Sequence, residues 1–410
     1  MADNRDKKVL KSSIEREQSQ TCLNSAESEK IKGSTNLNVP HLRFPEFSGE
    51  WIESKLGDIA DFSKGAGISK DQRSEEGNPC ILYGELYTRY KSEVITNVFS
   101  KTALPDSELV KSKANDIIIP ASGETAEDIA TARCVPYDNI LLGGDLNIIR
   151  LHEQDGKFFS YQLNGVRKYD IATVAQGVSV VHLHAGDLKG ITVKYPSHIA
   201  EQEKISQILG LIDDRIATQS KIIEELKTLR SALRYKLLDE MMVERTAKLG
   251  ELCRITTGKL DANAMVEGGG YPFFTCAEQV YEIDRYAFDT EALLVSGNGA
   301  NLGHIHYYCG KFNAYQRTYV LSDFSEDIQY LRQYLEAYLS KRIESEKNTG
   351  NTPYIVFGTL ADMEIKLPRV PEQQRIAHDL SVLTQKIENE THMFELFIQE
   401  KKTLLGKMFI

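Results

Sequence analysis

Glu201-Gln202-Glu203-Lys204-Ile205 recurs as Glu372-Gln373-Gln374-Arg375-Ile376, 171 positions further along the chain. The similarity continues beyond this motif, because apolar residues stand at the same offset in both copies. Their spacing alternates four and three residues, which is the period of a coiled-coil seam and not of a strand. The seam positions are Ile205, Leu209, Ile212, Ile216, Ile223, Leu226, Leu233 and Leu237 in the first copy, and Ile376, Leu380, Leu383, Ile387, Phe394, Phe397, Leu404 and Met408 in the second. The sequence therefore predicts two long, related helices.

Two seam positions in each copy are polar, and they are equivalent in the repeat: Gln219 and Arg230, then Glu390 and Lys401. If the helices pack antiparallel about a pseudo-two-fold axis, symmetry can place Gln219 opposite Lys401 and Arg230 opposite Glu390. A buried polar layer of this kind would fix register and orientation. The alternative is that all four positions are simply solvated.

A second repeat marks a domain start upstream of each helix. Lys55-Leu56-Gly57-Asp58-Ile59 returns as Lys248-Leu249-Gly250-Glu251-Leu252. Between each start and its helix lie short β-branched or aromatic runs separated by glycines, which are typical of strands. The sequence thus predicts a mixed α/β fold, with globular domains at 40–197 and 245–368 and coiled-coil helices at 198–244 and 369–410. Residues 1–39 are expected to form a tail that is disordered or ordered by a partner.

Composition limits the class of protein. A chain of 410 residues is long enough for two domains, and no apolar run approaches the roughly 20 residues that span a bilayer. The first 43 residues are polar and lack the apolar centre of a signal peptide, so we expect a cytoplasmic protein. Six scattered cysteines without a Cys-x-x-Cys pair argue against a disulfide framework. The net charge of −10 counts against nucleic-acid binding, although a basic groove can exist within an acidic total.

Catalytic motifs are absent from the sequence. It contains neither a nucleotide-binding Gly-x-x-x-x-Gly-Lys-Ser/Thr loop nor the Asn/Asp-Pro-Pro-Tyr motif of amino-methyltransferases. Glu364-Ile365-Lys366 matches the Glu-x-Lys fragment of metal-dependent nucleases, but a chain this rich in charge produces such tripeptides by chance. Histidine and cysteine can ligate a metal, and they occur in His304-Ile305-His306 with Cys309 and in His182-Leu183-His184. Alternate residues of any strand share a face, however, so this spacing also arises without a metal. We expect no catalytic residue and no metal site.

The duplication suggests what the chain does. A helix from about residue 199 to 242 would be roughly 65 Å long and would act as a spacer. Two similar but non-identical domains held apart by such helices could recognise two DNA half-sites of different sequence, separated by base pairs that are not read. The domain starts and helices match closely between the copies, whereas the loops do not.

These features together resemble the specificity subunits of type I restriction-modification systems. The resemblance rests on the Leu-Gly-Asp/Glu domain starts, the helix-entry motif after a proline and the duplicated order, and it covers about residues 40–410. Tyr83-Gly84-Glu85-Leu86-Tyr87-Thr88-Arg89-Tyr90 also resembles the recognition-domain pattern of the family. The resemblance implies one target-recognition domain per half of a bipartite double-stranded DNA target, and helices that dock two methyltransferase subunits.

The same resemblance assigns the chemistry to partners. Restriction and translocase subunits would join through the methyltransferase core, and S-adenosylmethionine, ATP and Mg²⁺ would be bound by the partners. The chain itself would bind no cofactor, no membrane and no small-molecule substrate. Docking needs an outward helix face as well as the seam, and Lys221, Glu225, Arg234 and Tyr235 are candidates that could equally be solvated.

Glycine-rich polar loops are the candidates for DNA contact, because they bring amides and side chains close to groove edges and phosphates. For any single loop, an ordinary turn between strands is an equally good interpretation. Lys64, Lys70, Arg89, Lys259 and Arg317 could contact phosphates or guanines. The other candidates are Tyr87, Thr88, Tyr90, Ser122, Gly123, Thr125, Gln176, Gly177 and Ser179 in the first domain, and Ser296, Asn298, Asn301, Asn348, Asn351 and Thr352 in the second, with Arg285-Tyr286 as a further possibility.

Two rival functions remain open at this stage. A stand-alone metal-dependent nuclease would cleave DNA as the purified chain. A coiled-coil scaffold would bind proteins and never DNA; net acidity favours it, whereas two domains with different loops argue against it.

Overall fold

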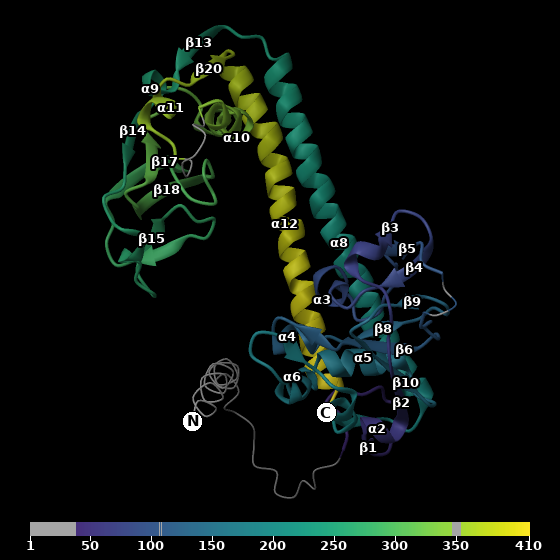
Figure 1. The fold of residues 1–410 in the computed structure, drawn as a ribbon. Coiled ribbons are helices and arrows are strands. Elements are labelled where there is room, and N and C mark those ends of the chain that lie inside the picture. The colour runs from purple at the N-terminus through teal and green to yellow at the C-terminus, as the bar shows by residue number, and fades with distance from the viewer. Residues whose placement is uncertain (1–37, 106, 108, 347–353) are drawn as a thin grey trace, which may run out of the picture. The chain divides into compact units, whose positions relative to one another are not determined.

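The structure is a computed structural model that describes residues 38–105, 107, 109–346 and 354–410. It divides into two compact units, the first formed by Met1–Gly210 with Lys402–Ile410 and the second by Leu211–Lys401. Two long helices, α8 (Ile199–Glu240) and α12 (Val370–Met408), each contribute to both units (Figure 1). Asn348, Asn351 and Thr352 lie outside the described residues. Among the described residues, no helix has the length and apolar character to cross a membrane.

The first unit is rich in short strands. Its helices are α2 (Leu56–Ile59), α3 (Glu85–Thr88), α4 (Ala126–Ile129), α5 (Gly156–Asn164), α6 (Lys168–Val174) and α7 (Ala185–Lys189), with a 3-10 turn at Lys70–Gln72. Its strands are β1 (Ile52–Lys55), β2 (Ala60–Lys64), β3 (Arg73–Ser74), β4 (Asn78–Ile81), β5 (Ser100–Thr102), β6 (Asp116–Pro120), β7 (Ser122–Gly123), β8 (Arg133–Val135), β9 (Leu141–Leu142), β10 (Leu146–Leu151), β11 (Val181–His182) and β12 (Thr192–Tyr195).

The main sheet of the first unit has the order β2-β10-β6-β8. Its central strand β6 carries three consecutive isoleucines, all buried, as expected of a β-branched run covered on both faces. The core beneath it contains Trp51, Phe158 and Met408 of α12, and Phe409, the residue that follows α12, packs against both rings. The last turn of α12 is therefore part of this core.

The second unit repeats the plan with fewer, longer elements. Its helices are α9 (Leu249–Leu252), α10 (Ile328–Ser345) and α11 (Phe357–Ala361), with a 3-10 turn at Ala262–Ala264. Its strands are β13 (Arg245–Lys248), β14 (Arg254–Thr257), β15 (Tyr271–Phe274), β16 (Tyr281–Ile283), β17 (Phe288–Ser296), β18 (Ile305–Ala314), β19 (Thr318–Ser322) and β20 (Glu364–Leu367).

The sheet orders show that the two units share one topology. The second unit has the order β14-β19-β17-β18-β15-β16, and its first four strands correspond to β2-β10-β6-β8. A two-stranded ladder joins the domain start to the last strand in each unit, β1 with β12 and β13 with β20. The prediction of a mixed α/β fold with two related domains is confirmed.

The glutamine of each helix-entry motif makes the same pair of hydrogen bonds to the backbone, which we call the glutamine clamp. Gln202 accepts a hydrogen bond from the backbone N–H of Asp155 (3.0 Å) and donates one to the carbonyl of Pro196 (2.9 Å). Gln373 does the same with Asp327 (3.2 Å) and Pro368 (3.0 Å). Asp155 and Asp327 in turn cap the N-termini of α5 and α10 with their side chains. Each clamp therefore joins the long helix, the last strand and a core helix.

The long helices run antiparallel, as predicted (Figure 1). The predicted seam positions are buried or half-buried: Ile205, Leu209, Ile212, Ile223, Ile376, Leu380 and Ile387 are buried, and Ile216, Leu226, Leu383, Phe394 and Phe397 are half-buried. Near the ends, the seam merges with the unit cores. Ile205 and Leu209 belong to the first core, and Ile376 and Leu380 to the second.

The predicted pairing of the polar seam residues is wrong. Gln219 donates to the backbone carbonyl of Glu390 (2.9 Å), its own repeat equivalent, so the local pseudo-two-fold axis of the helix pair passes between them. Arg230 donates to Thr384 (3.2 Å) instead of facing Glu390, and Lys401 pairs with Asp213 (2.5 Å) instead of facing Gln219. The register differs from the prediction by about one to one and a half heptads, and shifts of this size bring apolar seam residues back to the interface.

Candidate nucleic-acid interface

In the first unit, backbone pairing brings two of the predicted loops together. Ser122 and Gly123 form β7 and pair with His182 and Val181 of β11. The backbones of Gln176 and His182 exchange two hydrogen bonds, of 2.9 and 2.7 Å. The segment at Ser122 and the loop that follows Gln176 are therefore neighbours on one edge of the unit.

The loop from Gln176 to Val180 is tightly turned and exposed. Gly177 has a φ of +126°, and a Cβ there would lie 2.1 Å from the carbonyl oxygen of Val180, so only glycine fits. Ser179 is exposed, and Val178 is 97 % exposed, an unusual position for an apolar side chain. The structure thus presents this loop to solvent on a defined backbone.

Tyr87 and Thr125 lie beside this edge. Thr125 caps α4 by accepting a hydrogen bond from the N–H of Asp128 (3.1 Å). Burial raises the pKa of the Tyr87 hydroxyl, and the nearby Tyr83, Asp128 and Glu124 raise it further, so the phenol stays protonated and can donate a hydrogen bond at neutral pH. A Cβ at Gly123 would lie 3.8 Å from the Tyr87 hydroxyl, so Tyr87 of α3 lies at the same edge as the Ser122-Gly123 segment.

Two other residues of the predicted stretch from Tyr87 to Tyr90 do not belong to this edge. Tyr90 is only 4 % exposed and packs in a core cluster with Ile81 and Leu86. Arg89 pairs with the buried Glu85 (3.1 Å) and lies over the ring of Phe99. Sequence pattern did not reveal these roles, because α3 is a single short turn whose buried face cannot be identified from periodicity. We remove Tyr90 from the interface and assign Arg89 a structural role; Thr88 is exposed and donates to the Gly84 carbonyl (2.7 Å).

The second unit builds the same edge with different side chains. The N–H of Gly297 donates to the carbonyl of Arg317 (2.9 Å), as that of Ala121 does to Asp145 (2.7 Å) in the first unit. Asn298 forms a bridge with Tyr354, as Ser122 does with His182. The hydrogen bonds therefore align Ser122-Gly123 with Asn298-Gly299.

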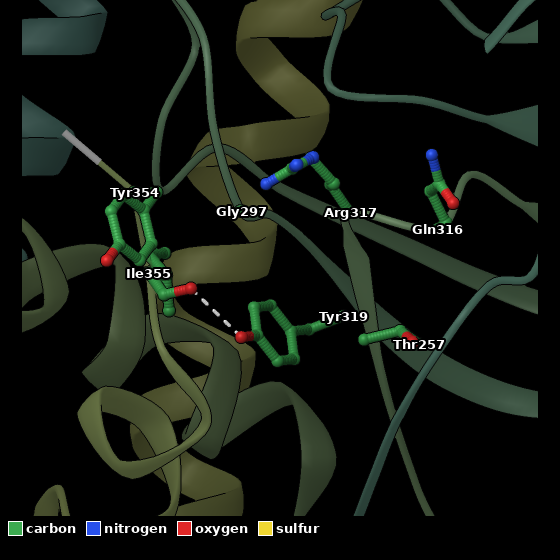
Figure 2. Close-up of a pocket in the computed structure, with 7 residues that line it drawn as sticks. All are labelled: Thr257, Gly297, Gln316, Arg317, Tyr319, Tyr354 and Ile355. Carbon is green, nitrogen blue, oxygen red and sulfur yellow. Dashed lines mark hydrogen bonds between the residues drawn. The ribbon is translucent and has the colours of Figure 1, made fainter. Parts of the chain in front are cut away.

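A cavity of about 330 Å³ lies at this edge of the second unit (Figure 2). Tyr319 lines it and donates from its hydroxyl to the carbonyl of Ile355 (2.9 Å). At the equivalent position in the first unit, Asn147 donates to the carbonyl of Leu183 (2.9 Å). The residues that line the cavity are Thr257, Gly297, Gln316, Arg317, Tyr319, Tyr354 and Ile355.

The other predicted residues of the second unit lie near this cavity. Lys259 is exposed, and its neighbour Leu260 accepts a hydrogen bond from the N–H of Gln316 (2.8 Å). Asn301 donates to the carbonyl of Cys276 (3.3 Å). Ser296 is fully buried, and its hydroxyl has no hydrogen-bond partner in the described part of the chain, so it is not available to DNA as placed. In the first unit, Lys64 and Lys70 are exposed.

Four exposed residues of these edges were not predicted as DNA contacts: Asp145, His182, Gln316 and Tyr354. Asp145 occupies the position equivalent to Arg317, which was predicted and has the opposite charge. His182 and Tyr354 form a second equivalent pair. Only the hydrogen-bond pattern reveals these equivalences, because the loops between the repeats differ in length.

The histidine and carboxylate motifs have structural surroundings. The Nε2 of His306 is 3.0 Å from the carbonyl of Ala277, and burial lowers the pKa of the ring. Asp362, near the Glu-x-Lys tripeptide, pairs with Lys248 (2.9 Å). Within the ranges the structure describes, no three His, Cys, Asp or Glu side chains gather to hold a metal.

The outward helix face also differs from the prediction. Arg234 is 8 % exposed and donates to Gln333 of α10 (2.9 Å), and the Tyr235 hydroxyl donates to the carbonyl of Ala337 (3.0 Å). Both residues therefore pack against α10 inside the second unit and are not available for docking. Lys221 and Glu225 are exposed and pair with each other (3.7 Å).

Apolar side chains lie exposed on the same helices. Leu211 and Ile222 of α8 are 58 % and 37 % exposed, and their repeat equivalents Val382 and Met393 of α12 are 54 % and 44 % exposed. Leu229 of α8, one heptad beyond Ile222, is 54 % exposed. The repeat thus places exposed apolar side chains at equivalent positions of both long helices.

Comparisons with known proteins agree with this architecture. The model of the type I restriction modification DNA specificity domain matches residues 48–228 and again 243–394. The EcoDI specificity subunit of Escherichia coli is 45 % identical over 146 residues, which are 35 % of this chain and 32 % of that protein. A putative type I specificity subunit of Mycoplasma pneumoniae is 23 % identical over 71 % of this chain and 86 % of its own length.

Solved structures show the same fold. The specificity subunit of a type I system from M. genitalium superimposes with a TM-score of 0.65 at 19 % identity, covering 91 % of this chain and 99 % of that one. A chain from a structure on assembly of the type I restriction-modification system gives a TM-score of 0.52 at 15 % identity, covering 88 % and 97 %. The present chain belongs to the family of type I restriction-modification DNA specificity subunits. It is a specificity subunit and not itself a catalytic one.

Proposed function

We propose that each unit recognises one half of a bipartite DNA target through the loop edge described above. The observation that carries the proposal is the repeated frame with different exposed residues: Asp145 against Arg317, and His182 against Tyr354, on matching backbone hydrogen bonds. A frame that is constant while its exposed side chains change suits two half-sites of different sequence. The gap between the half-sites is not read.

The helices supply the docking surface for partners. The apolar pairs Leu211 with Val382 and Ile222 with Met393 are equivalent in the repeat, so they offer two related surfaces, one for each of two methyltransferase subunits. Restriction and translocase subunits join through that core. S-adenosylmethionine, ATP and Mg²⁺ are bound by the partners, where the chemistry takes place, and the complex acts on DNA in the cytoplasm.

The experiment is co-expression of this chain with its cognate methyltransferase subunit, followed by single-molecule sequencing of the host DNA. We expect adenine methylation in a split motif with an unread gap, present only when this chain is expressed. A coiled-coil scaffold would also account for the exposed apolar side chains of α8 and α12. Unmodified DNA together with no co-purifying methyltransferase would therefore favour the scaffold, and metal-dependent cleavage by the purified chain would favour a nuclease.

A further inference from the structure

Arg317 is presented by a short, firmly held turn. The N–H of Thr318 donates to the carbonyl of Tyr315 (2.8 Å), which closes the turn, and Thr318 itself is buried as the first residue of β19. The carbonyl of Arg317 accepts the hydrogen bond from Gly297. A Cβ at Gly297 would lie 2.4 Å from that oxygen, so glycine is required for this close approach. The backbone beneath the arginine is thus fixed from two sides.

The guanidinium of Arg317 is available to a ligand. In the parts of the chain that the structure describes, no carboxylate pairs with it, whereas Arg254 of the same unit pairs with Asp323 (2.9 Å). Figure 2 shows the side chain extending from the turn on the side of the cavity where Tyr354 lies, with Gln316 on the other side. Tyr354 is 59 % exposed. An arginine, a glutamine amide and an exposed aromatic ring therefore line the same cavity.

The first unit has the opposite charge at this position. Asp145 is exposed, has a φ of +57° and is held by the hydrogen bond from Ala121. Arginine suits guanine, because its two parallel N–H groups match the O6 and N7 acceptors, whereas aspartate can accept from the amine of cytosine. Phosphate oxygens only accept hydrogen bonds, and an ionised aspartate has none to donate, so a phosphate contact shared by both units at this position does not account for the change of sign.

We propose that Arg317 is a specificity-determining residue that contacts a guanine in the major groove of the half-site bound by the second unit. Gln316 flanks it on the same turn, and the hydrogen bond from its Nε2 to Asp261 (2.9 Å) fixes its amide. The inference rests on the proposed function, because it assigns one position of the second half-site to one side chain.

The test uses the complex with its methyltransferase and the methylation motif as the readout. Arg317→Lys keeps the charge but loses the bidentate geometry, and Arg317→Ala loses both. With either variant, we expect one guanine of the second half-site to become variable while the first half-site stays unchanged. Methylation of the original target should fall roughly 5- to 150-fold at limiting enzyme. Arg254→Ala is the matched control, an exposed arginine with its own carboxylate partner, and should leave the motif and the rate unchanged.

Three results separate the possibilities. Relaxation at one guanine with an intact first half-site supports the inference, and the intact half also shows that the variant folds and assembles. An unchanged motif, with methylation reduced equally at all sites or not reduced, overturns the inference and makes Arg317 a phosphate or solvent contact. A wild-type complex that yields no split motif would instead overturn the proposed function itself.

Discussion

Gln202→Ala tests whether the glutamine clamp holds the first unit together. The substitution leaves the N–H of Asp155 and the carbonyl of Pro196 buried without their partner. Each unsatisfied buried group costs about 1–3 kcal/mol, so the free energy of unfolding should fall by about 2–5 kcal/mol. Asp155 caps α5, whose Phe158 contacts Trp51 at a ring-centroid distance of 5.6 Å. Loss of the clamp should therefore shift the unfolding transition that the fluorescence of Trp51 reports.

The assay is urea unfolding followed by tryptophan fluorescence. Trp51 is the single tryptophan of the chain and is 2 % exposed, so its emission reports on the first unit. With a urea dependence of about 3 kcal/mol per molar, the midpoint should fall by about 1 M. Gln207→Ala, an exposed glutamine one turn further along α8, should change stability by less than about 0.5 kcal/mol. Coincident transitions for the two variants would refute the reasoning.

Three further predictions concern the helices and the first loop edge. Asp213→Ala should lower the free energy of unfolding in urea by about 2 kcal/mol, because it removes the carboxylate opposite the half-buried Lys401. Replacing both residues by leucine should restore most of this stability, and a double variant as unstable as the single one would contradict the prediction. Gly177→Ala strains the exposed loop and should reduce methylation at the target by more than about tenfold. Gly186→Ala is the control, because a Cβ there meets open space, and it should leave methylation unchanged. Equal methylation by the two variants would exclude a role for the loop. Leu211→Asp, at a side chain that is 58 % exposed, should abolish co-purification of the methyltransferase while changing stability by less than about 0.5 kcal/mol, and an undiminished complex would exclude these exposed apolar side chains as the docking surface.

The sequence predicted the duplication because the repeated residues are those that the fold needs. Gln202 and Gln373 clamp a helix cap and a strand end, and the apolar seam positions are buried or half-buried. The register could not be predicted in the same way. A heptad pattern repeats every seven residues, so several pairings of Gln219 and Arg230 satisfy it, and only side-chain packing selects one.

The loop edges were predictable in place but not in detail. Glycines identified the turns at Gly177 and Gly297, because close backbone approach requires them. Exposure was harder to predict, since Tyr90 and Arg234 carry polar groups yet are buried against α3 and α10 neighbours. The equivalence of Asp145 with Arg317 depends on tertiary hydrogen bonds between segments far apart in the chain, which no local pattern records.

The packing of Phe409 against Trp51 has a consequence for biosynthesis. Domains generally fold in the order in which they leave the ribosome. Here Met408 and Phe409 belong to the core that Trp51 and Phe158 begin, and they are synthesised only after the whole of the second unit. The unit translated first is therefore completed last, and its apolar surface stays open until the end of α12 emerges. A stop codon or a pause within α12 should leave this nascent unit dependent on chaperones and exposed to proteases.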